Sequence, residues 1–173
     1  MNLYEHPRLY RLLDALVSLG YNSKARRRFE AYLFSEMPRG SSVLELGSGN
    51  GSFSKSFYSS YRVLGVDLSC WGPDRLRADA RLLPFRSKGF DYSVFPFSLS
   101  TIGLEALREA GRVSRHAIYV LDFVASKVKR LGPLGELGGA IFESKPLGSE
   151  LDGYKVMEFS IYGIYKIPLG STP

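Results

Sequence analysis

The first forty residues carry apolar side chains at the spacing of two amphipathic helices. The first predicted helix spans residues 3–19. The second begins near Ser23 as its N-cap and ends before Pro38 and Gly40. The apolar faces consist of Leu9, Leu12, Leu13, Leu16 and Val17 in the first helix, and of Ala25, Phe29, Tyr32, Leu33 and Met37 in the second. We expect the two helices to form a cap, residues 1–40, placed before the main domain.

From residue 42 the pattern changes to short apolar runs separated by helical stretches. The predicted strands are Ser42–Leu46, Arg62–Val66, Leu76–Ala80, Phe90–Phe95 and Ala117–Phe123. The predicted helices among them are Ser52–Ser59 and Leu104–Val113. Buried strands that alternate with helices are typical of parallel sheets. The sequence therefore predicts an α/β fold with a Rossmann-like, doubly wound, mostly parallel sheet.

The C-terminal part of the chain predicts a different element. Two strand-like runs, Tyr154–Ser160 and Tyr162–Ile167, are joined through Gly163 and suit an antiparallel hairpin. Over residues 127–140, several glycines and Pro133 predict a helix that is short or broken. We expect one compact unit overall, in which residues 41–173 form the main domain.

Composition narrows the class of protein. The chain has 173 residues, and 23 Lys and Arg against 17 Asp and Glu give a formal charge of +6, a weak indication of an anionic partner. The single Cys70 excludes an internal disulfide and indicates a reducing, cytoplasmic location, while two distant histidines predict no metal site. The longest apolar stretch, Ala117–Ala125, contains Asp122 and is too short to span a membrane. Charged residues among the first twenty argue against a secretory signal.

The stretch most informative about function is the glycine-rich turn after the first predicted strand. Gly47, Gly49 and Gly51 stand at alternate positions, which permits a tight turn and a close approach of the backbone to a ligand. A P-loop would need Lys followed by Ser or Thr at the end of the turn, and Lys55 is misplaced for it. A dinucleotide fingerprint would need a small residue at position 52, where Ser52 stands, so that ligand class stays open.

The position of Asp67 strengthens the prediction of a ligand site at the glycine-rich turn. It lies 20 residues after Gly47, at the end of the second predicted strand. A carboxylate at that place can accept hydrogen bonds from both hydroxyls of a ribose. Hydrogen bonds to a charged group contribute about 1.5–3 kcal/mol each. The spacing therefore predicts a nucleoside in the crevice without saying which one.

Five motifs follow one another in order between residues 42 and 123. They are Glu45-x-Gly47-x-Gly49-x-Gly51, Gly65-Val66-Asp67-Leu68-Ser69, Ala78-Asp79-Ala80, Leu83-Pro84-Phe85 and Phe90-Asp91. This set resembles the class I methyltransferases that use S-adenosylmethionine, and most of all the small single-domain group labelled type 11. The resemblance implies S-adenosylmethionine as cofactor and methyl transfer to an acceptor that is a small molecule or RNA.

The resemblance also implies roles for individual residues. Gly47, Gly49 and Gly51 would line the methionine part of the cofactor, Asp67 would hold the ribose, and Asp79 with Ala80 would contact the adenine. The cofactor site implied in this way further includes Glu45, Ser48, Asn50, Leu68 and Phe95. Only 12 residues separate Asp67 from Asp79, so the helix usual between these strands has no room, and we expect a pocket that is more open on that side.

The acceptor side is less defined. Phe95, Pro96 and Phe97 would line the reaction site, and the predicted substrate-binding residues are Phe97, Ser98, Arg26 and Arg27. Ser98, Ser100, Tyr92 and Asp122 are candidates for positioning an acceptor. The Asn/Asp-Pro-Pro motif of many enzymes that methylate exocyclic amines is absent. No catalytic residue is assigned, because alignment alone can supply about 7–11 kcal/mol of the barrier.

Several alternatives stay open. The runs Arg26–Arg28 and Lys127–Arg130 are either solvated faces or phosphate contacts beside the active-site mouth. The protein is either a methyltransferase or a non-catalytic S-adenosylmethionine-binding module, such as a partner subunit. A nicotinamide-dependent oxidoreductase is disfavoured, because the chain is short and no substrate domain follows.

Overall fold

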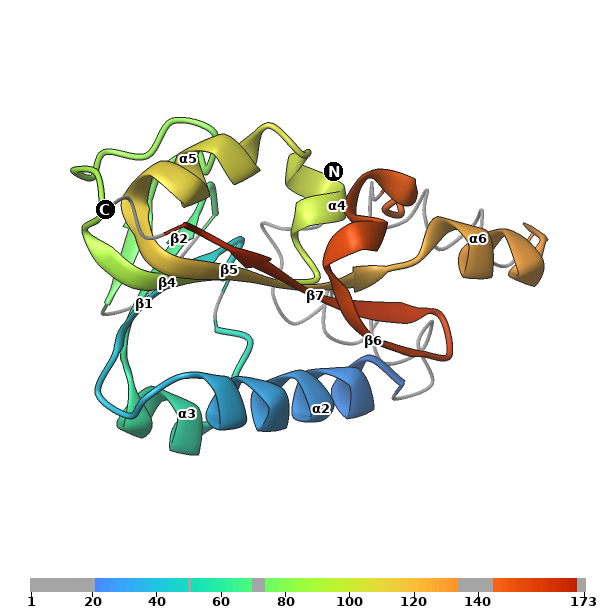
Figure 1. Ribbon diagram of the computed structural model, residues 1–173, viewed down its shortest axis with the longest axis horizontal. Helices are drawn as coiled ribbons and strands as arrows, with labels where there is room; N and C mark the ends of the chain where they lie inside the picture. Colours follow the sequence, from blue (N-terminus) through green and yellow to red (C-terminus); the bar gives the residue numbers. More distant parts are fainter. Residues whose placement is uncertain (1–20, 50, 70–73, 134–144, 171–173) are drawn as a thin grey trace.

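The computed structural model describes residues 21–49, 51–69, 74–133 and 145–170. Its strands are β1 (Ser42–Leu46), β2 (Arg62–Asp67), β3 (Arg75–Arg77), β4 (Phe90–Pro96), β5 (Ser114–Phe123), β6 (Lys155–Phe159) and β7 (Tyr162–Pro168). Its helices are α2 (Tyr21–Glu36), α3 (Lys55–Ser60), α4 (Leu99–Ile102), α5 (Ala106–Val113) and α6 (Ala125–Val128), with the 3-10 helices η2 (Lys129–Leu131) and η3 (Ser149–Tyr154). Within these residues the strands form one seven-stranded sheet in the order β3-β2-β1-β4-β5-β7-β6 (Figure 1).

The pairing of the strands confirms the predicted fold class. The sheet is parallel from β3 to β5, and it is antiparallel where β5 meets β7 and where β7 meets β6. The strand order reverses at β1, because β2 and β3 lie on one side of it and β4 on the other. In open parallel sheets, ligands bind at the carboxyl ends of the strands beside such a reversal. The loops after β1 and β4 are therefore the places where a site is expected.

Helices cover both faces of the sheet. In Figure 1, α2 and α3 lie below the sheet, and α4 and α5 lie above it. α2 turns Ala25, Phe29 and Leu33 toward the sheet, where all three are fully buried. The predicted apolar face of this helix is thus confirmed, and α2 forms part of a layer on the sheet. The first predicted helix, residues 3–19, lies outside the described residues, and the domain boundary after residue 40 stays a prediction.

Two helix starts differ from the prediction for local reasons. α2 already contains Ser23, so Ser23 is not its N-cap. α3 begins at Lys55 rather than at Ser52, because Ser54 has an extended backbone, with φ −72° and ψ 162°, and is the N-cap. The side chain of Ser54 then accepts a hydrogen bond from the first turn and caps the helix.

The third strand and the hairpin turn also differ. β3 ends before Asp79, whose carbonyl accepts the N–H of Leu82 in a turn, so Asp79 and Ala80 lie in a loop. The hairpin of β6 and β7 is confirmed, but its turn includes Ser160, which has a φ of 54°, rather than Gly163. Gly163 lies inside β7, where it is paired on both sides.

Candidate functional site

The glycine-rich turn after β1 passes close to the ends of two neighbouring strands. The N–H groups of Gly47 and Ser48 both donate to the Val66 carbonyl of β2, at 2.8 and 3.1 Å. Gly47 has a φ of 71°, and a Cβ atom there would clash with the side chain of Ser98, which follows β4. At Gly49, with a φ of 48°, a Cβ atom would meet no described residue within 4 Å. The turn is therefore packed tightly at Gly47 and is not covered at Gly49 by the described part of the chain.

The buried side chain of Glu45 stabilises this turn by hydrogen bonds. Its side chain is fully buried, Oε1 accepts the N–H of Ser52 at 2.9 Å, and Oε2 accepts the hydroxyl of Tyr58 at 2.8 Å. Burial raises the pKa of the Glu45 carboxyl, and burial together with the nearby Glu45 raises the pKa of Tyr58. Glu45 thus presents no surface to a ligand and positions the loop. The motif contains Glu45 but not Tyr58, so the sequence carried no signal for this partner.

Asp67 lies at the end of β2 beside the turn. Its Oδ2 accepts the N–H of Gly49 at 2.9 Å, and its Oδ1 accepts the N–H of Ser69 at 2.8 Å. Each carboxylate oxygen has a further lone pair, so both can accept another hydrogen bond. The next residue, Leu68, is an apolar side chain that is 58% exposed. Asp67 therefore links the turn to an uncovered apolar surface.

The structure places the other predicted cofactor residues in different surroundings. Ser48 is buried, and its hydroxyl has no hydrogen-bond partner among the described residues. Asn50 lies outside the described residues. Asp79 forms an ion pair with Arg81 at 2.7 Å, and the hydrogen bonds from Arg81 lower the pKa of Asp79. Ala80 packs in the hydrophobic core, so its side chain is only 5% exposed.

At the end of β4 the side chains divide between core and surface. Phe95 is fully buried in the core, and Ser98 is buried with its hydroxyl donating to the Leu46 carbonyl at 2.6 Å. Phe97 between them is half-buried, and its φ of 63° is unusual for a bulky residue. Such backbone conformations concentrate at functional sites. Phe95 and Ser98 therefore belong to the protein interior, and Phe97 between them is partly exposed.

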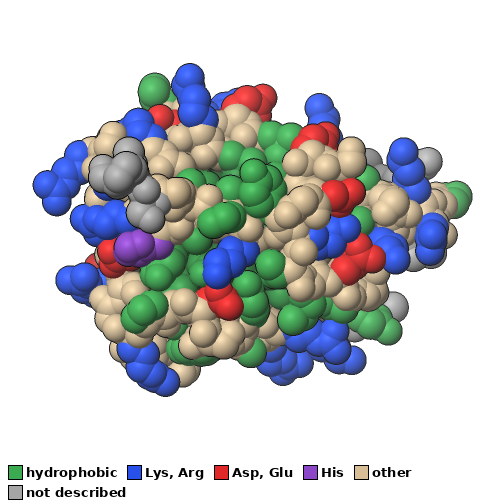
Figure 2. Space-filling view, viewed as in Figure 1, with side chains coloured by type: hydrophobic (Ala, Val, Ile, Leu, Met, Phe, Trp, Pro, Cys, Tyr) green, Lys and Arg blue, Asp and Glu red, His purple; other side chains and the backbone are tan. Residues whose placement is uncertain are grey.

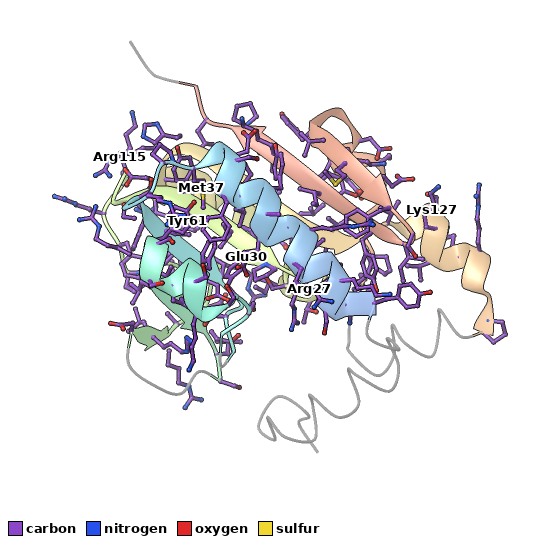
Figure 3. All side chains as sticks on the ribbon, turned by 90° about the horizontal axis from the view of Figure 1, so that it is seen from below. Arg27, Glu30, Met37, Tyr61, Arg115 and Lys127 are labelled. Atoms are coloured by element: carbon purple, nitrogen blue, oxygen red, sulfur yellow. The ribbon has the colours of Figure 1, made fainter. Side chains whose placement is uncertain are left out.

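Two predicted substrate residues from distant parts of the chain come together here. The guanidinium carbon of Arg26 lies 5.4 Å from the centroid of the Phe97 ring. Arg27 is exposed at the start of α2 (Figure 3). The Phe97 ring also packs near Phe123 and Tyr162, at centroid distances of 5.4 and 5.5 Å. The start of α2 therefore borders the end of β4.

Asp122, at the end of β5, is fully buried rather than exposed to an acceptor. Its carboxylate accepts the N–H of Ser100 at 2.8 Å and that of Phe123 at 2.9 Å. Burial raises the pKa of Asp122 to about 6. Asp122 therefore holds α4, the short helix after Phe97, against the end of β5. Tyr92, another candidate for positioning an acceptor, is also buried.

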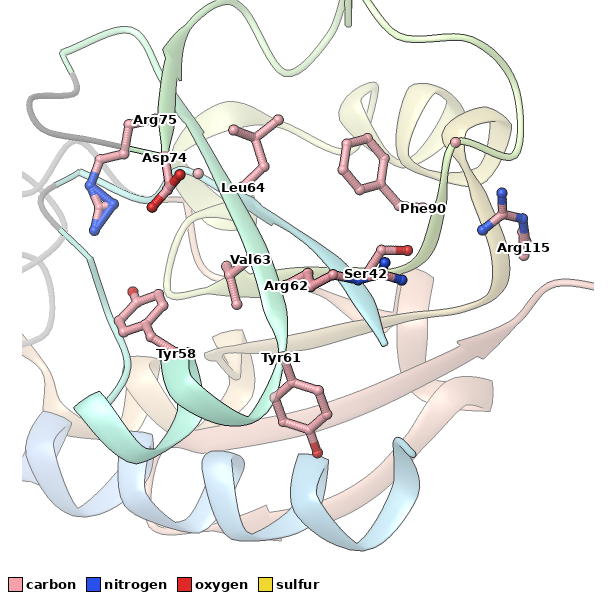
Figure 4. Close-up of a pocket in the computed structure, with 12 residues that line it drawn as sticks. Ser42, Tyr58, Tyr61, Arg62, Val63, Leu64, Asp74, Arg75, Phe90 and Arg115 are labelled. Atoms are coloured by element: carbon pink, nitrogen blue, oxygen red, sulfur yellow. The ribbon is translucent and has the colours of Figure 1, made fainter. Parts of the chain in front are cut away.

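A cavity of about 840 Å³ lies along β2 (Figure 4). Ser42, Arg62, Phe90 and Arg115 line it where their strands begin, and it extends along β2 to Arg75. β3 pairs only with the last three residues of β2, so the first half of that strand has an open edge. None of the described residues predicted to bind the cofactor lines this cavity. Two of its lining residues, Tyr58 and Arg75, nevertheless lie so close to Gly51 that a Cβ atom there would clash with both. The cavity therefore adjoins the turn after β1 from the side of β2.

Two further features bear on the kind of site. Among the described residues, no three His, Cys, Asp or Glu side chains are grouped so that they could hold a metal ion. No helix in the described part of the chain is long and apolar enough to cross a membrane. The described arrangement can accept hydrogen bonds from a polar ligand at Asp67 and contact an apolar one at Leu68.

By sequence, no family model and no curated protein matches this chain. By structure, it resembles magnesium protoporphyrin IX methyltransferase (ChlM) from Synechocystis PCC 6803 with bound SAH. The two are 14% identical with a TM-score of 0.58, over 89% of this chain and 85% of that one. ChlM with bound SAM aligns in the same way, at 12% identity and a TM-score of 0.57, over 88% of this chain and 81% of that one.

Other similar structures are longer than this chain. A Haloferax volcanii protein described as a methyltransferase, in complex with the Trm112 methyltransferase activator, is 18% identical with a TM-score of 0.54, over 78% of this chain and 69% of that one. One from Anabaena variabilis, described as a methyltransferase of an antibiotic biosynthesis pathway, is 18% identical with a TM-score of 0.52, over 64% of this chain. The match covers only 53% of the length of that protein. The strand order and these likenesses together show that the chain has the fold of the class I S-adenosylmethionine-dependent methyltransferases.

Proposed function

We propose that this protein binds S-adenosylmethionine at the carboxyl ends of β1 and β2 and transfers its methyl group to an acceptor beside Phe97. The observation that carries the proposal is the pairing of Gly49 with Asp67. No described residue outside the turn approaches Gly49, and among the described residues the Asp67 carboxylate accepts one N–H at each oxygen, which leaves each oxygen able to accept a ribose hydroxyl. This pair lies where the strand order reverses, which is where such folds bind nucleosides.

The hydrogen bonds of the turn favour a sulfonium nucleoside over a dinucleotide. A pyrophosphate needs backbone N–H groups that point toward it. Here the N–H groups of Gly49, Gly51 and Ser52 already donate to Asp67, to the Ser48 carbonyl and to Glu45. Few N–H groups of the described turn are therefore left for a pyrophosphate.

The residue roles follow from this placement. In the proposal, Gly47, Gly49 and Gly51 line the methionine part, together with Ser48 and Asn50. Asp67 accepts the ribose hydroxyls, and the exposed Leu68 packs on the base. Asp79 and Ala80 border the adenine edge. Glu45 and Phe95 act from below, as supports of the turn and of the end of β4. The bound SAM and SAH in ChlM support the choice of cofactor.

S-adenosylmethionine supplies an activated methyl group on a positively charged sulfur. The task left to the chain is alignment of the acceptor with that methyl group, which can account for about 7–11 kcal/mol. The strained Phe97 and the Arg26 guanidinium above it are the described groups best placed to orient an acceptor. We assign no catalytic base, because the Ser98 hydroxyl is bonded to the Leu46 carbonyl and Asp122 is buried.

The test is calorimetry with S-adenosylmethionine and with NAD. We expect micromolar binding of the former and none of the latter. Asp67→Ala should weaken binding at least tenfold, because one lost hydrogen bond to a charged group costs about 1.5–3 kcal/mol. Asp152→Ala is the matched control, because this exposed aspartate lies in η3, outside the proposed site. Absence of heat with S-adenosylmethionine, or equal effects of the two substitutions, would contradict the proposal.

A second candidate is a partner subunit that binds S-adenosylmethionine without catalysis. Two observations favour it: Ser98 and Asp122 are withdrawn from the surface, and the similar Haloferax protein was solved together with an activator. Incubation with labelled cofactor and cellular RNA, protein and small-molecule fractions separates the two functions. Label in one fraction supports the methyltransferase, and label in none supports the binding subunit. For either function we propose a cytoplasmic location, on the ground of the single cysteine.

A further inference from the structure

Two basic segments that are far apart in the sequence meet at one end of the molecule. We call Arg26, Arg27, Arg28, Lys127, Lys129 and Arg130 the basic rim. The guanidinium carbon of Arg28 lies 4.7 Å from the centroid of the Phe159 ring, and Lys127 forms an ion pair of 2.9 Å with the adjacent Glu158. In Figure 3 the labelled Arg27 lies near the lower middle of the view, and Lys127 lies to its upper right. The tip of the β6–β7 hairpin therefore joins the two segments into one surface.

Most of the positive charge on the basic rim is not neutralised. Lys127 is paired with Glu158, but the described part of the chain offers no ion-pair partner to Arg27, Arg28, Lys129 or Arg130. All four of these side chains are exposed. In Figure 2, Lys and Arg side chains gather at the lower right, where α2 begins, and at the right end, where α6 lies. This end of the protein therefore attracts anions.

Two of these arginines are held in fixed orientations. Arg26 lies over the ring of Phe97, and Arg28 lies over the ring of Phe159. A guanidinium stacked on an aromatic ring keeps the N–H groups at its edge for a phosphate, which it can hold with two hydrogen bonds. The Nε atom of Arg26 is buried and has no acceptor among the described residues. Arg26 and Arg28 thus each lie beside an aromatic ring, where a phosphate and a base of one strand can be contacted together.

The basic rim adjoins the proposed methyl-transfer site. Arg26 contacts Phe97, and the next residue, Ser98, is bonded to the Leu46 carbonyl beside the glycine turn. The rings of Phe97, Phe123 and Phe159 are all half-buried, so each keeps an exposed part. Proteins that bind single-stranded nucleic acids combine a positive surface for the phosphates with aromatic rings for the bases. Both parts are present here, side by side.

We propose that the methyl acceptor is carried by a single-stranded nucleic acid, whose phosphates lie on the basic rim and whose bases stack at Phe97 and Phe159. This inference rests on the proposed function. A nitrogen or oxygen atom of the strand attacks the methyl carbon of S-adenosylmethionine with a lone pair. The bond between the methyl carbon and the sulfur breaks, and its electrons stay on the sulfur. S-adenosylhomocysteine leaves, and any proton of the acceptor atom passes to water.

The test measures the affinity of the protein for labelled strands of oligo(U) RNA and oligo(dT) DNA, each about twelve nucleotides long, by fluorescence anisotropy. The salt concentration is varied from about 50 to about 300 mM. If about four phosphates are contacted, the logarithm of affinity falls with the logarithm of salt at a slope of about −3. Arg27→Ala and Arg130→Ala should each weaken binding about three- to tenfold and reduce the slope by about 0.7. Arg62→Ala removes the same charge at the start of β2, beside the cavity of Figure 4, and should change neither.

Calorimetry with S-adenosylmethionine on the same samples separates the two proposals. Binding of both cofactor and strand supports the inference, and a preference for RNA or DNA then names the source of the acceptor. Cofactor binding without strand binding overturns the inference alone, as does an equal loss in Arg62→Ala. Strand binding without cofactor binding overturns the proposed function and, with it, the role of the strand as acceptor.

Discussion

The buried carboxyl group of Asp122 should make the free energy of unfolding of this protein depend on pH. This carboxyl group is fully buried at the end of β5, and the N–H groups of Ser100 and Phe123 donate hydrogen bonds to it. These hydrogen bonds do not outweigh the loss of water, so burial raises the pKa of Asp122 from 3.8 to about 6. Between about pH 4 and pH 6, Asp122 therefore keeps its proton in the folded protein but has released it in the unfolded chain.

The sign and size of the effect follow from proton linkage. Between about pH 4 and 6 the folded state binds more protons than the unfolded state, so the free energy of unfolding falls as the pH rises. The stabilisation is complete below the unfolded pKa and is lost as the pH rises through the folded one. With the pKa at about 6 in the folded state, the loss from Asp122 between pH 4 and pH 7 is about 2 kcal/mol.

The assay is urea denaturation of the wild type and of Asp122→Asn from pH 4 to pH 7.5. Asn imitates the protonated carboxyl and does not titrate, so its difference from the wild type isolates this one group. We expect the stability of the variant relative to wild type to rise by about 2 kcal/mol between pH 4 and pH 7. A difference that stays constant with pH would refute the reasoning, because it would mean that Asp122 has the same pKa in both states.

The remaining predictions concern the glycine turn and the acid side of the pH profile. Gly47→Ala should lower stability by about 2–4 kcal/mol and abolish cofactor binding, because its Cβ clashes with Ser98, whereas Gly49→Ala should cost only about 1–2 kcal/mol for its positive φ. Thermal unfolding and calorimetry measure both, and equal effects would contradict the packing difference. The hydrogen bond from Arg112 lowers the pKa of Glu109 to about 2, so stability should fall as the pH drops from about 4.5 toward 2. In Glu109→Gln the free energy of unfolding should fall less over this pH range than in the wild type, as denaturation curves would show. The same pH profile in both proteins would contradict the lowered pKa of Glu109.

Sequence patterns predicted the elements whose signals are local. Periodicity and turn chemistry over short windows of about twenty residues or fewer predicted three elements. These are the strand before Gly47, the strand that ends at Asp67 and the apolar face of α2. α4 was missed, because its four residues have no apolar period, and the N–H of Ser100 is held by Asp122 from another strand. Phe95 was assigned to the cofactor site, but β4 is a central strand with helices on both faces of the sheet, so Phe95 and its neighbour Val94 are both fully buried, in cores on opposite faces.

By itself, the sequence determined the fold class and the position of the glycine turn and Asp67, because a turn that needs positive φ and a carboxylate at a strand end are local requirements. Only the tertiary structure decided which polar groups face a ligand. Glu45 and Ser98 turn inward because their hydrogen-bond partners come from other elements, Ser52 and Leu46. The contact of Arg26 with Phe97 likewise depends on how α2 packs across the sheet. Such contacts arise from strand order and packing, which no short pattern of residues encodes.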